Sequence, residues 1–369
     1  MPTSTSLVET PCHRHHFFVG GIYVEDKTSL FGGYMMRGQT YVERLTPVGG
    51  ARLSPALILV HGGGQSGMNW LRTPDGRKGW ASYFLDQGYE VYVVDTAARG
   101  RSAPDSAQEY IHYPTGMVEQ FWTATKAFAQ WPQASLHTQW PGTGRKGDPV
   151  FDEYYASILP SSVDLVAYQQ AQGDGLAALL KHIGGASIVL VHSQGAPAGW
   201  LAADTCPDLV KAIIAVEPNG PPFAGVHPHN NTPARLWGLT DVPMTFSPPV
   251  AMPSMFRLVT SDTGREAKSP VVLQDERDSE APVRQLTKLK DIRVLVEVGE
   301  ASYHAGFDHA TVAFLRQAGV RCDFIELEKE GIHGNGHMQM LELNNLEIAA
   351  VLHKWIVDND LATACAQSC

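Results

Sequence analysis

The sequence predicts an α/β protein in which helices cover both faces of an eight-stranded, mostly parallel sheet. Short apolar runs rich in β-branched residues alternate with longer segments whose apolar residues recur at i, i+3 and i+4. The composition is that of a globular protein, with 44% hydrophobic and 18% charged residues. A chain of 369 residues can form one large domain with insertions, so we predict a single domain over residues 1–369.

The strands and helices follow one another in a regular order. The first two strands are expected at 16–24 and 38–47, joined by a short glycine-rich connection into an antiparallel hairpin at the sheet edge. Six further strands are expected at 56–64, 89–95, 186–193, 211–218, 292–300 and 321–328. The covering helices are expected at 79–88, 162–185, 309–320 and 343–359. Parallel sheets present ligand-binding residues at the carboxyl ends of their strands, so candidate site residues are sought there.

Two stretches, 101–160 and 221–290, do not fit the alternation of strands and helices. The first is rich in aromatic residues and the second in proline. Long loops of this kind are usually functional, and we predict a lid after the fourth strand and a cap after the sixth. Both stretches are expected to shape a largely apolar substrate pocket, and the candidate pocket residues are Trp122, Trp131 and Trp140.

Charge, cysteine content and the N-terminus restrict the partners and the location. The formal net charge of −10 disfavours nucleic acid, because 28 Lys and Arg cannot form a dominant basic face against 38 Asp and Glu. The five cysteines have no metal or redox spacing, so reduced thiols are expected, with a Cys365–Cys369 disulfide as the alternative. No signal-peptide pattern or run long enough to span a bilayer is found, which predicts a cytoplasmic protein with no membrane partner. The oligomeric state stays open, and a homodimer is one alternative.

Ser193 is the candidate nucleophile in the stretch "IVLVHSQGAPAG", residues 188–199. It ends an expected strand and precedes small residues that allow a helix to start close to the sheet. Gly195 is expected to accept strained backbone geometry behind the serine, whereas Val191 occupies the position where a glycine is expected. A serine needs a base, an acid and oxyanion donors to react. The alternative is that Ser193 only caps a helix.

Glu217 is the candidate acid, because it ends the next expected strand after the one that Ser193 ends. The chain returns to the same sheet edge, where neighbouring strands lie ~5 Å apart, so the two side chains are expected to share a histidine. Glu300, at the end of the following strand, is the rival acid. A further alternative is that Glu217 simply faces water.

His337 is the candidate base, on a glycine-rich loop between the last strand and the last helix. His333 competes with it but lies nearer the loop apex, whereas packing against the start of the helix can fix the ring of His337. The other histidines lack the cysteine or carboxylate spacing of a metal site, including those at 13, 15, 16, 227 and 229. No metal and no cofactor are therefore expected.

The stretch "HGGGQSG", residues 61–67, supplies candidate oxyanion donors. Its consecutive glycines let backbone N–H groups approach a ligand, and the N–H groups of Gln194 and of the Gly63 to Gly64 region are expected to form an oxyanion hole. One such donor is worth about 3 kcal/mol of transition-state stabilisation. The alternative, a phosphate-binding loop, lacks both the Gly-Lys-Ser/Thr ending and the G-x-G-x-x-G pattern.

The order Ser193, Glu217, His337, with the glycine loop ahead of them, resembles the α/β-hydrolase superfamily over nearly the whole chain. The likeness is to a bacterial and fungal esterase branch whose triad glutamate follows the sixth strand, and it rests on "PDGRKGW", "QWPGTG", "VEPNGPP" and "GNGHMQMLELNN". The resemblance implies an α/β-hydrolase fold, a Ser-His-Glu triad, a cap, no cofactor and carboxylic ester substrates. Val191 departs from the superfamily pattern, as does Ser302, which occupies a seventh-strand position where aspartate is common.

We therefore predict a serine hydrolase that cleaves an ester or lactone of a small, largely apolar substrate through an acyl-enzyme. Ser193 attacks the carbonyl, His337 transfers the proton and Glu217 orients His337. A long-chain lipase is disfavoured, because no strongly amphipathic lid helix is found. The same triad leaves a thioesterase, an amidase or an acyltransferase open, and the fold also leaves a lyase or a binding protein open.

Overall fold

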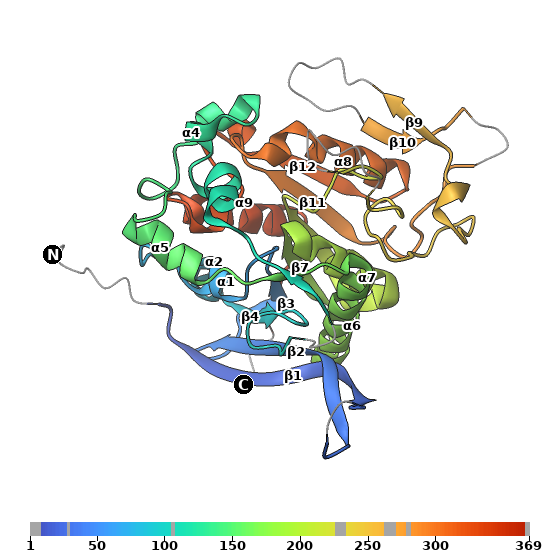
Figure 1. The fold of residues 1–369 in the computed structure, drawn as a ribbon, viewed down its shortest axis with the longest axis horizontal. Coiled ribbons are helices and arrows are strands. Elements are labelled where there is room, and N and C mark those ends of the chain that lie inside the picture. Colours follow the sequence, from blue (N-terminus) through green and yellow to red (C-terminus); the bar gives the residue numbers. More distant parts are fainter. Residues whose placement is uncertain are drawn as a thin grey trace.

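A nine-stranded sheet forms the centre of the protein (Figure 1). The computed structural model describes residues 9–27, 30–104, 108–225, 234–261, 271–277 and 282–365. The strands lie in the order β1-β2-β4-β3-β7-β8-β11-β12, and a short β13 pairs with β3. Their bounds are Cys12–Glu25 (β1), Tyr34–Pro47 (β2), Leu53–Val60 (β3), Tyr89–Asp95 (β4), Ser187–His192 (β7), Val210–Val216 (β8), Arg293–Val298 (β11), Cys322–Glu326 (β12) and Thr363–Ala364 (β13).

The pairing of the strands confirms a mostly parallel sheet with an antiparallel edge. Strand β1 pairs with β2, and β2 with β4, in antiparallel register. From β4 to β12 every neighbouring pair is parallel. All eight expected strands are present. The additional strand β13 has only two residues, which is too short for any hydrophobic alternation to predict.

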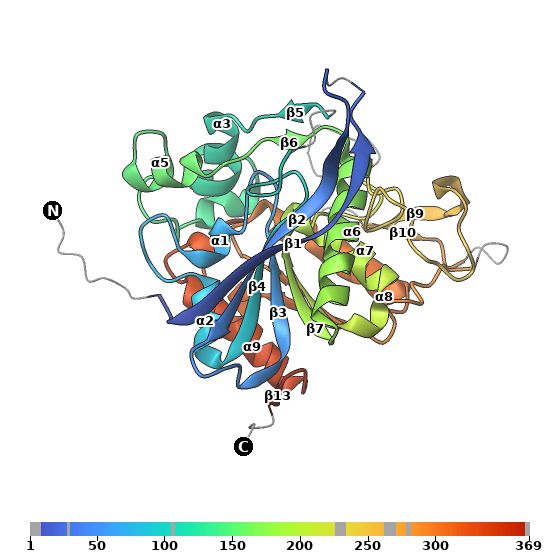
Figure 2. The same ribbon diagram turned by 90° about the horizontal axis from the view of Figure 1, so that it is seen from below.

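Helices cover both faces of the sheet, as predicted (Figure 2). The side chains of β7 show the two layers, because Ile188 and Leu190 pack with α2 and α9 while Val189 and Val191 pack with α6 and α7. The covering helices are Trp80–Gln87 (α2), Leu165–Ile183 (α6), Ala196–Thr205 (α7), Asp308–Gln317 (α8) and Asn345–Asp358 (α9). This burial on both sides explains why the parallel strands are continuously apolar in sequence.

Short helices and turns make up much of the segment between β4 and α6, which includes the expected lid. They are β5 (Tyr110–Ile111), α3 (Thr115–Val118), the π-helix η1 (Glu119–Thr123), α4 (Thr125–Phe128), η2 (Pro132–Leu136), α5 (Pro149–Ala156) and β6 (Ser161–Ser162). In Figure 2 the labels α3, α5, β5 and β6 lie together above one end of the sheet. The Asp148 side chain caps α5 by accepting from the N–H groups of Val150 and Phe151. The role of residues 101–160 as a lid stays a prediction.

The segment between β8 and β11, the expected cap, contains η5 (Pro253–Met255) and an antiparallel pair of β9 (Leu258–Ser261) and β10 (Val271–Gln274) in its described part. The remaining short elements are α1 (Met68–Leu71), η3 (Ser193–Gly195), η4 (Pro207–Leu209), η6 (Tyr303–Gly306), η7 (Leu327–Glu330) and η8 (Gln339–Leu341). Within the described ranges, no helix is both long and apolar enough to cross a membrane.

The cysteines in the described part of the chain are free thiols: Cys12, Cys206, Cys322 and Cys365. This agrees with the expected reduced state at those four positions. Cys369, the other half of the alternative disulfide, lies outside the described residues, as do the histidines at 227 and 229.

Val191 replaces the expected glycine because the helix supplies the missing space. A Cβ atom at Gly199, on α7, would lie 2.9 Å from Cγ1 of Val191. The valine side chain is fully buried and is stiff at χ1, so it cannot move aside. The small residue therefore lies on the helix at this contact and not on the strand.

We expect Gly199→Ala to destabilise the protein by about 1–3 kcal/mol through overpacking, although alanine is the better helix former by about 1 kcal/mol. In a Val191→Ala background the same substitution should be neutral or stabilising, because the clashing methyl group is gone. Urea unfolding of the four proteins of this cycle measures both effects. A stabilising Gly199→Ala in the wild-type background would contradict the proposed contact.

Candidate active site

Ser193 lies on the sharp turn between β7 and α7. Its φ of +48° is in the left-handed region, which is costly for a residue with a side chain. Gly195 has an ordinary φ of −75°, so the prediction that this glycine accepts the strain is wrong. Gly195 is needed for close approach, since a Cβ there would lie 2.4 Å from the carbonyl oxygen of His61. The turn leaves Ser193 partly accessible in an otherwise buried region.

The structure brings Ser193, His337 and Glu217 together from three different elements. Glu217 directly follows β8, and His337 lies on the loop between η7 and η8. The Nε2 atom of His337 is 3.1 Å from the Oγ atom of Ser193, and its Nδ1 atom is 2.6 Å from the Oε2 atom of Glu217. An ionised Glu217 can only accept, so Nδ1 carries the ring proton and Nε2 is free to accept from Ser193. This arrangement suits transfer of the serine proton to the imidazole.

Two donors besides His337 hold the carboxylate of Glu217. The backbone N–H of Gly299 donates to Oε1 at 2.9 Å, and the hydroxyl of Ser302 donates to Oε2 at 2.6 Å. Both donors follow β11, the strand next to β8. Ser302, noted in the sequence only as a departure from the superfamily pattern, therefore supports the acid on the neighbouring strand.

The rival residues Glu300 and His333 contact each other. Nδ1 of His333 is 3.2 Å from a carboxylate oxygen of Glu300, and the N–H of Gly334 donates to the other oxygen at 2.9 Å. The His333 side chain is 63% exposed. Both rivals are satisfied by these contacts outside the triad, and neither reaches the hydroxyl of Ser193.

The glycine loop packs directly against the serine turn. A Cβ at Gly62 would lie 3.1 Å from Cβ of Ser193, and a Cβ at Gly63 would lie 2.9 Å from Oε1 of Gln194. Gly64 has a φ of +70° and lies beneath the ring of Tyr113. The described part of the chain provides no hydrogen-bond acceptor for the N–H groups of Gly63 and Gly64. The N–H of Gln194 lies in a first helical turn and lacks an intrahelical partner.

Comparison with known proteins places this site in a family. Residues 55–258 match the model of a family described as the alpha/beta hydrolase fold. A fungal protein named probable secreted lipase phiG, from Fungal sp. (strain ATCC 74256), is 42% identical over 334 residues, covering 89% of each chain. The chain belongs to the alpha/beta hydrolase family. The resemblance to the α/β-hydrolase superfamily is thereby confirmed.

A solved structure supports the same family. A protein described as a novel bacterial esterase is 25% identical, covers 97% of this chain and 99% of its own, and superposes with a TM-score of 0.60. Together these relatives show that this alpha/beta hydrolase is of the lipase and esterase type.

The prediction of a cytoplasmic location is wrong, because the fungal relative is named a probable secreted lipase. That prediction depended on the absence of a recognisable leader in the sequence. The absence of a pattern is no positive sign of any compartment, so a relative's described location outweighs it.

Two further histidines hold His337 in this hydrolase. Nε2 of His192, which ends β7, is 3.1 Å from the carbonyl oxygen of His337 and fixes its backbone. The ring of His304 stacks on that of His337 at 4.8 Å with an interplanar angle of 4°, and its Nδ1 atom is 2.9 Å from Asp308. Sequence reasoning missed both residues. The only available signal was their position beside the ends of β7 and β11.

Burial controls the protonation of His337 and Glu217. It lowers the pKa of His337 well below its usual range, an effect reinforced by His304, so the ring is neutral and able to accept a proton. Burial also raises the pKa of Glu217 to about 7, against the lowering effects of His304, Ser302 and Gly299. The carboxylate that orients the base is therefore lost on mild acidification.

A second buried carboxyl lies next to Glu217. The N–H of Glu217 donates to the carbonyl of Glu297 at 2.9 Å, and Gln339 donates to the Glu297 carboxyl at 2.8 Å. Burial, then the charge of Glu217, raises the pKa of Glu297 well above its usual range. Both effects favour the neutral form of Glu297, which reduces its repulsion of the ionised Glu217.

Donor atoms of Glu217, His304 and His337 all lie within 4.8 Å of one another, which is a spacing that could suit a metal ion. The hydrogen bonds of these groups favour another interpretation. His337 Nδ1 and Glu217 Oε2 face each other at 2.6 Å, and His304 Nδ1 faces Asp308. We therefore interpret the cluster as a hydrogen-bonded triad with a stacked supporting histidine.

The three expected pocket tryptophans separate in the structure. Trp122 is buried, with its ring 6.3 Å from that of His337. Trp131 lies further out, 5.8 Å from the ring of Tyr303, which in turn lies 4.9 Å from His337. Trp140 is also buried and packs against Tyr154, and its role in the pocket stays a prediction. An aromatic wall beside the triad is thus formed by Trp122, Trp131 and Tyr303, and Tyr303 was missed from the sequence.

We expect the activity of this hydrolase to fall as the pH drops through about 7, because Glu217 is then protonated. Ser302→Ala removes a hydrogen bond that favours the ionised carboxylate, so the pKa of Glu217 rises and the acid limb of kcat/KM moves to higher pH. The pH profile of kcat/KM with a soluble ester measures this shift. Ser302→Thr, which keeps the hydroxyl, is the matched control, and an acid limb that stays in place in Ser302→Ala would refute the assignment.

Proposed function

We propose that the protein is a serine hydrolase of carboxylic esters that works through an acyl-enzyme. The observation that carries this proposal is the continuous chain of contacts from Ser193 Oγ to His337 Nε2, at 3.1 Å, and from His337 Nδ1 to Glu217 Oε2, at 2.6 Å. These are the distances at which nucleophile, base and orienting acid act as a unit. The names of the relatives, a lipase and an esterase, support the same reaction class.

In the first half of the reaction, Ser193 Oγ attacks the ester carbonyl while its proton passes to His337 Nε2. The imidazolium formed is stabilised by Glu217, and it then protonates the departing alcohol as the acyl C–O bond breaks. In the second half, His337 removes a proton from water, which attacks the acyl-enzyme. The acid is released and Ser193 recovers its proton. Tyr303, whose hydroxyl is 3.4 Å from His337 Nε2, lies where it can contact the bound substrate.

The negative charge that develops on the carbonyl oxygen requires donors beside Ser193. The N–H groups of Gln194 and of Gly63 or Gly64 are suited to this, because the glycine loop packs against the serine turn. His61 fixes the start of this loop. Its Nε2 accepts from the N–H of Thr96 at 3.1 Å, so its Nδ1 carries a proton and lies 2.9 Å from the carbonyl of Gly62. Donors held in this way need no reorganisation during the reaction.

The aromatic wall favours small apolar substrates. Trp122 and Tyr303 lie against His337, and Tyr113 lies over Gly64. Such a surface suits aryl, alicyclic or medium-length acyl groups, in an open ester or in a lactone. Thioesters, amides and acyl transfer use the same triad, and they are distinguished by comparing rates on matched substrates.

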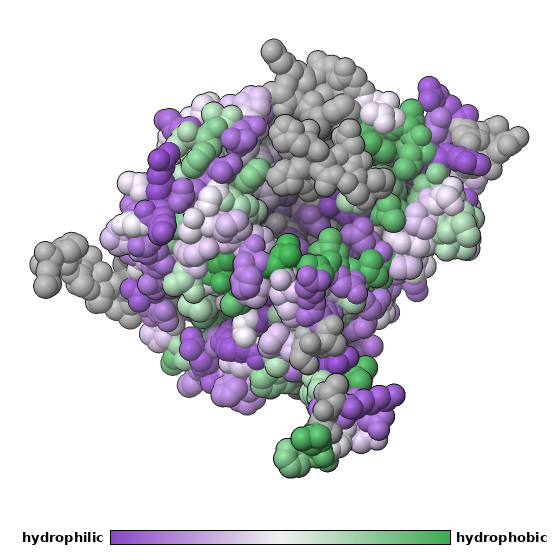
Figure 3. All heavy atoms as spheres, viewed as in Figure 1, coloured by the Kyte–Doolittle hydropathy of each residue, from purple (hydrophilic) through white to green (hydrophobic). Residues whose placement is uncertain are grey.

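A lipase acting at a lipid surface is the second candidate, and the β1–β2 hairpin favours it. Leu30 and Phe31 are each 99% exposed at its tip, which appears as a green patch at the bottom of Figure 3. Ile22, Tyr23 and Tyr34 are also exposed on the same hairpin. Exposed apolar side chains of this kind are suited to a lipid interface. An extracellular location, inferred from the name of the fungal relative, suits either candidate.

We expect Ser193→Ala and His337→Ala each to lower kcat for a soluble p-nitrophenyl ester by at least about 10⁴-fold, because the triad acts as a unit. His333→Ala and Glu300→Gln should keep the wild-type rate, since these residues contact each other outside the triad. Steady-state kinetics and labelling by a fluorophosphonate measure this directly. Full activity in Ser193→Ala would end the proposal.

The same assay separates the two candidates. Rates are compared on short-chain esters, lactones and a long-chain triglyceride emulsion, with wild type and a Leu30→Ser/Phe31→Ser variant. An esterase should prefer the soluble substrates and tolerate the hairpin changes. Strong activation by the emulsion that the hairpin variant loses would favour the lipase instead.

A further inference from the structure

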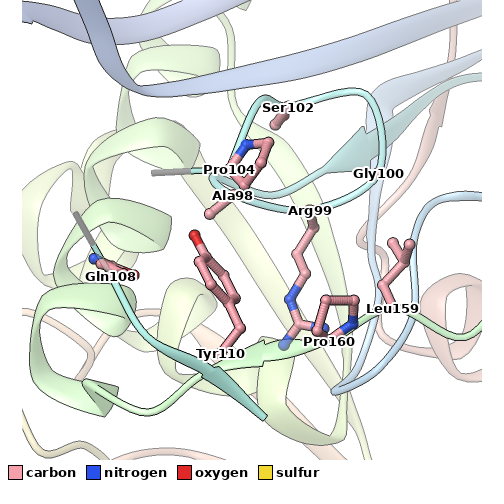
Figure 4. A pocket seen from close by; sticks show the side chains of 9 residues that line it. All are labelled: Ala98, Arg99, Gly100, Ser102, Pro104, Gln108, Tyr110, Leu159 and Pro160. Carbon is pink, nitrogen blue, oxygen red and sulfur yellow. The ribbon is translucent and has the colours of Figure 1, made fainter. Parts of the chain in front are cut away.

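Arg99 lies deep in the protein on the turn after β4, and only 2% of it is exposed. Its Nε atom donates to the hydroxyl of Tyr168 at 2.9 Å. Its Nη2 atom donates to the hydroxyl of Ser161 and, at 3.1 Å, to the side-chain oxygen of Gln194. Figure 4 shows the Arg99 side chain extending from the turn past Pro160. The guanidinium thus joins the turn after β4 to the residue that follows Ser193.

None of these partners neutralises the charge. Within the described ranges Arg99 forms no ion pair, and its Nη1 atom has no hydrogen-bond partner. Arg101, two residues further on, differs in this respect, because it pairs with both Asp95 and Glu43. Burying an unpaired cation is costly, so the retention of Arg99 at this position suggests a use for its charge.

The position of Arg99 indicates its use. Gln194 supplies one proposed oxyanion donor, and its side-chain oxygen lies 2.9 Å from where a Cβ of Gly63 would be, at the second donor loop. Arg99 binds that same oxygen and so fixes Gln194 against the glycine loop. On its other side is a cavity of about 440 Å³, whose lining includes Ala98, Leu159 and Pro160 (Figure 4).

We propose that Arg99 is a positioning residue of the oxyanion hole and the source of a positive field behind it, an inference that rests on the proposed function. It holds Gln194 so that the backbone N–H faces the reacting carbonyl. Its unneutralised charge stabilises the negative charge that appears on the carbonyl oxygen in the transition state and is absent from the bound ester. Arg99 therefore acts on kcat and not on substrate binding.

Arg99→Gln tests this proposal, with Arg99→Lys and Arg101→Gln as matched variants. We expect Arg99→Gln to lower kcat for a p-nitrophenyl ester by about 10-fold or more, with KM nearly unchanged. The rate of inactivation by a fluorophosphonate should fall in parallel, because its addition also places negative charge on an oxygen in the hole. Arg99→Lys keeps the charge and should recover part of both rates. Arg101→Gln should lower the melting temperature but leave both rates at the wild-type level.

Wild-type kcat in folded Arg99→Gln, a loss confined to KM, or an equal loss in Arg101→Gln would each overturn the proposal. Should Arg99→Gln not fold, Gln194→Leu breaks the same contact and keeps the backbone donor. The rates of Gln194→Leu, Arg99→Lys and the double variant that carries both changes are then compared. If the double variant is no slower than the slower single variant, the two residues act together, as proposed. If the fold-losses in kcat of the two single variants multiply in the double variant, they act independently and the proposal is contradicted. Phosphonate labelling without ester turnover in the wild type would refute the proposed function, while the labelling rates would still test Arg99.

Discussion

The 2.6 Å contact between Glu217 and His337 is the interaction on which the rest of the site depends. It requires β8 to end beside β7 and β11, and the loop after η7 to fold back over their ends. Once the contact forms, the tautomer of His337 is fixed and its Nε2 atom faces Ser193. Gly299 and Ser302 hold the carboxylate, while His192 and His304 hold the ring. The parallel sheet therefore brings residues that are distant in the sequence together at one edge.

This dependence explains which parts of the protein were predictable. Strands and helices follow from local hydrophobic periodicity, the candidates Ser193 and Glu217 from their places at strand ends, and the candidate His337 from its place on the glycine-rich loop before the last helix. Ser302, His304 and Arg99 were not predictable as supports, because their roles depend on side-chain contacts between elements far apart in the sequence. The packing of Trp140 against Tyr154 was not predictable for the same reason, since an aromatic-rich segment does not indicate which rings contact each other. Periodicity identifies a buried face but not the neighbour across it.

The serine turn shows how one local rule can be met in two ways. Close approach of a helix and a strand needs a small residue on at least one side of the contact, and here Gly199 allows Val191 to remain on the strand. The positive φ values of Ser193 and Glu217 are a separate matter, because both belong to non-glycine residues that end neighbouring strands. Such strain persists only where surrounding contacts determine the backbone. Its location at two proposed catalytic residues is what a site held rigidly by its scaffold would show.

Charge is distributed unevenly around this site, in a way that suits the proposed ester cleavage. On the acid side, burial and the charge of Glu217 raise the pKa of Glu297 and favour its neutral form, while the Glu217 carboxylate contacts His337. Beside Gln194, the residue after Ser193, Arg99 carries a positive charge that no carboxylate in the described part of the chain neutralises. In the proposed ester cleavage, positive charge develops on the histidine and negative charge on the carbonyl oxygen. In this proposed mechanism, a carboxylate beside the histidine and a cation beside Gln194 stabilise the separated charges.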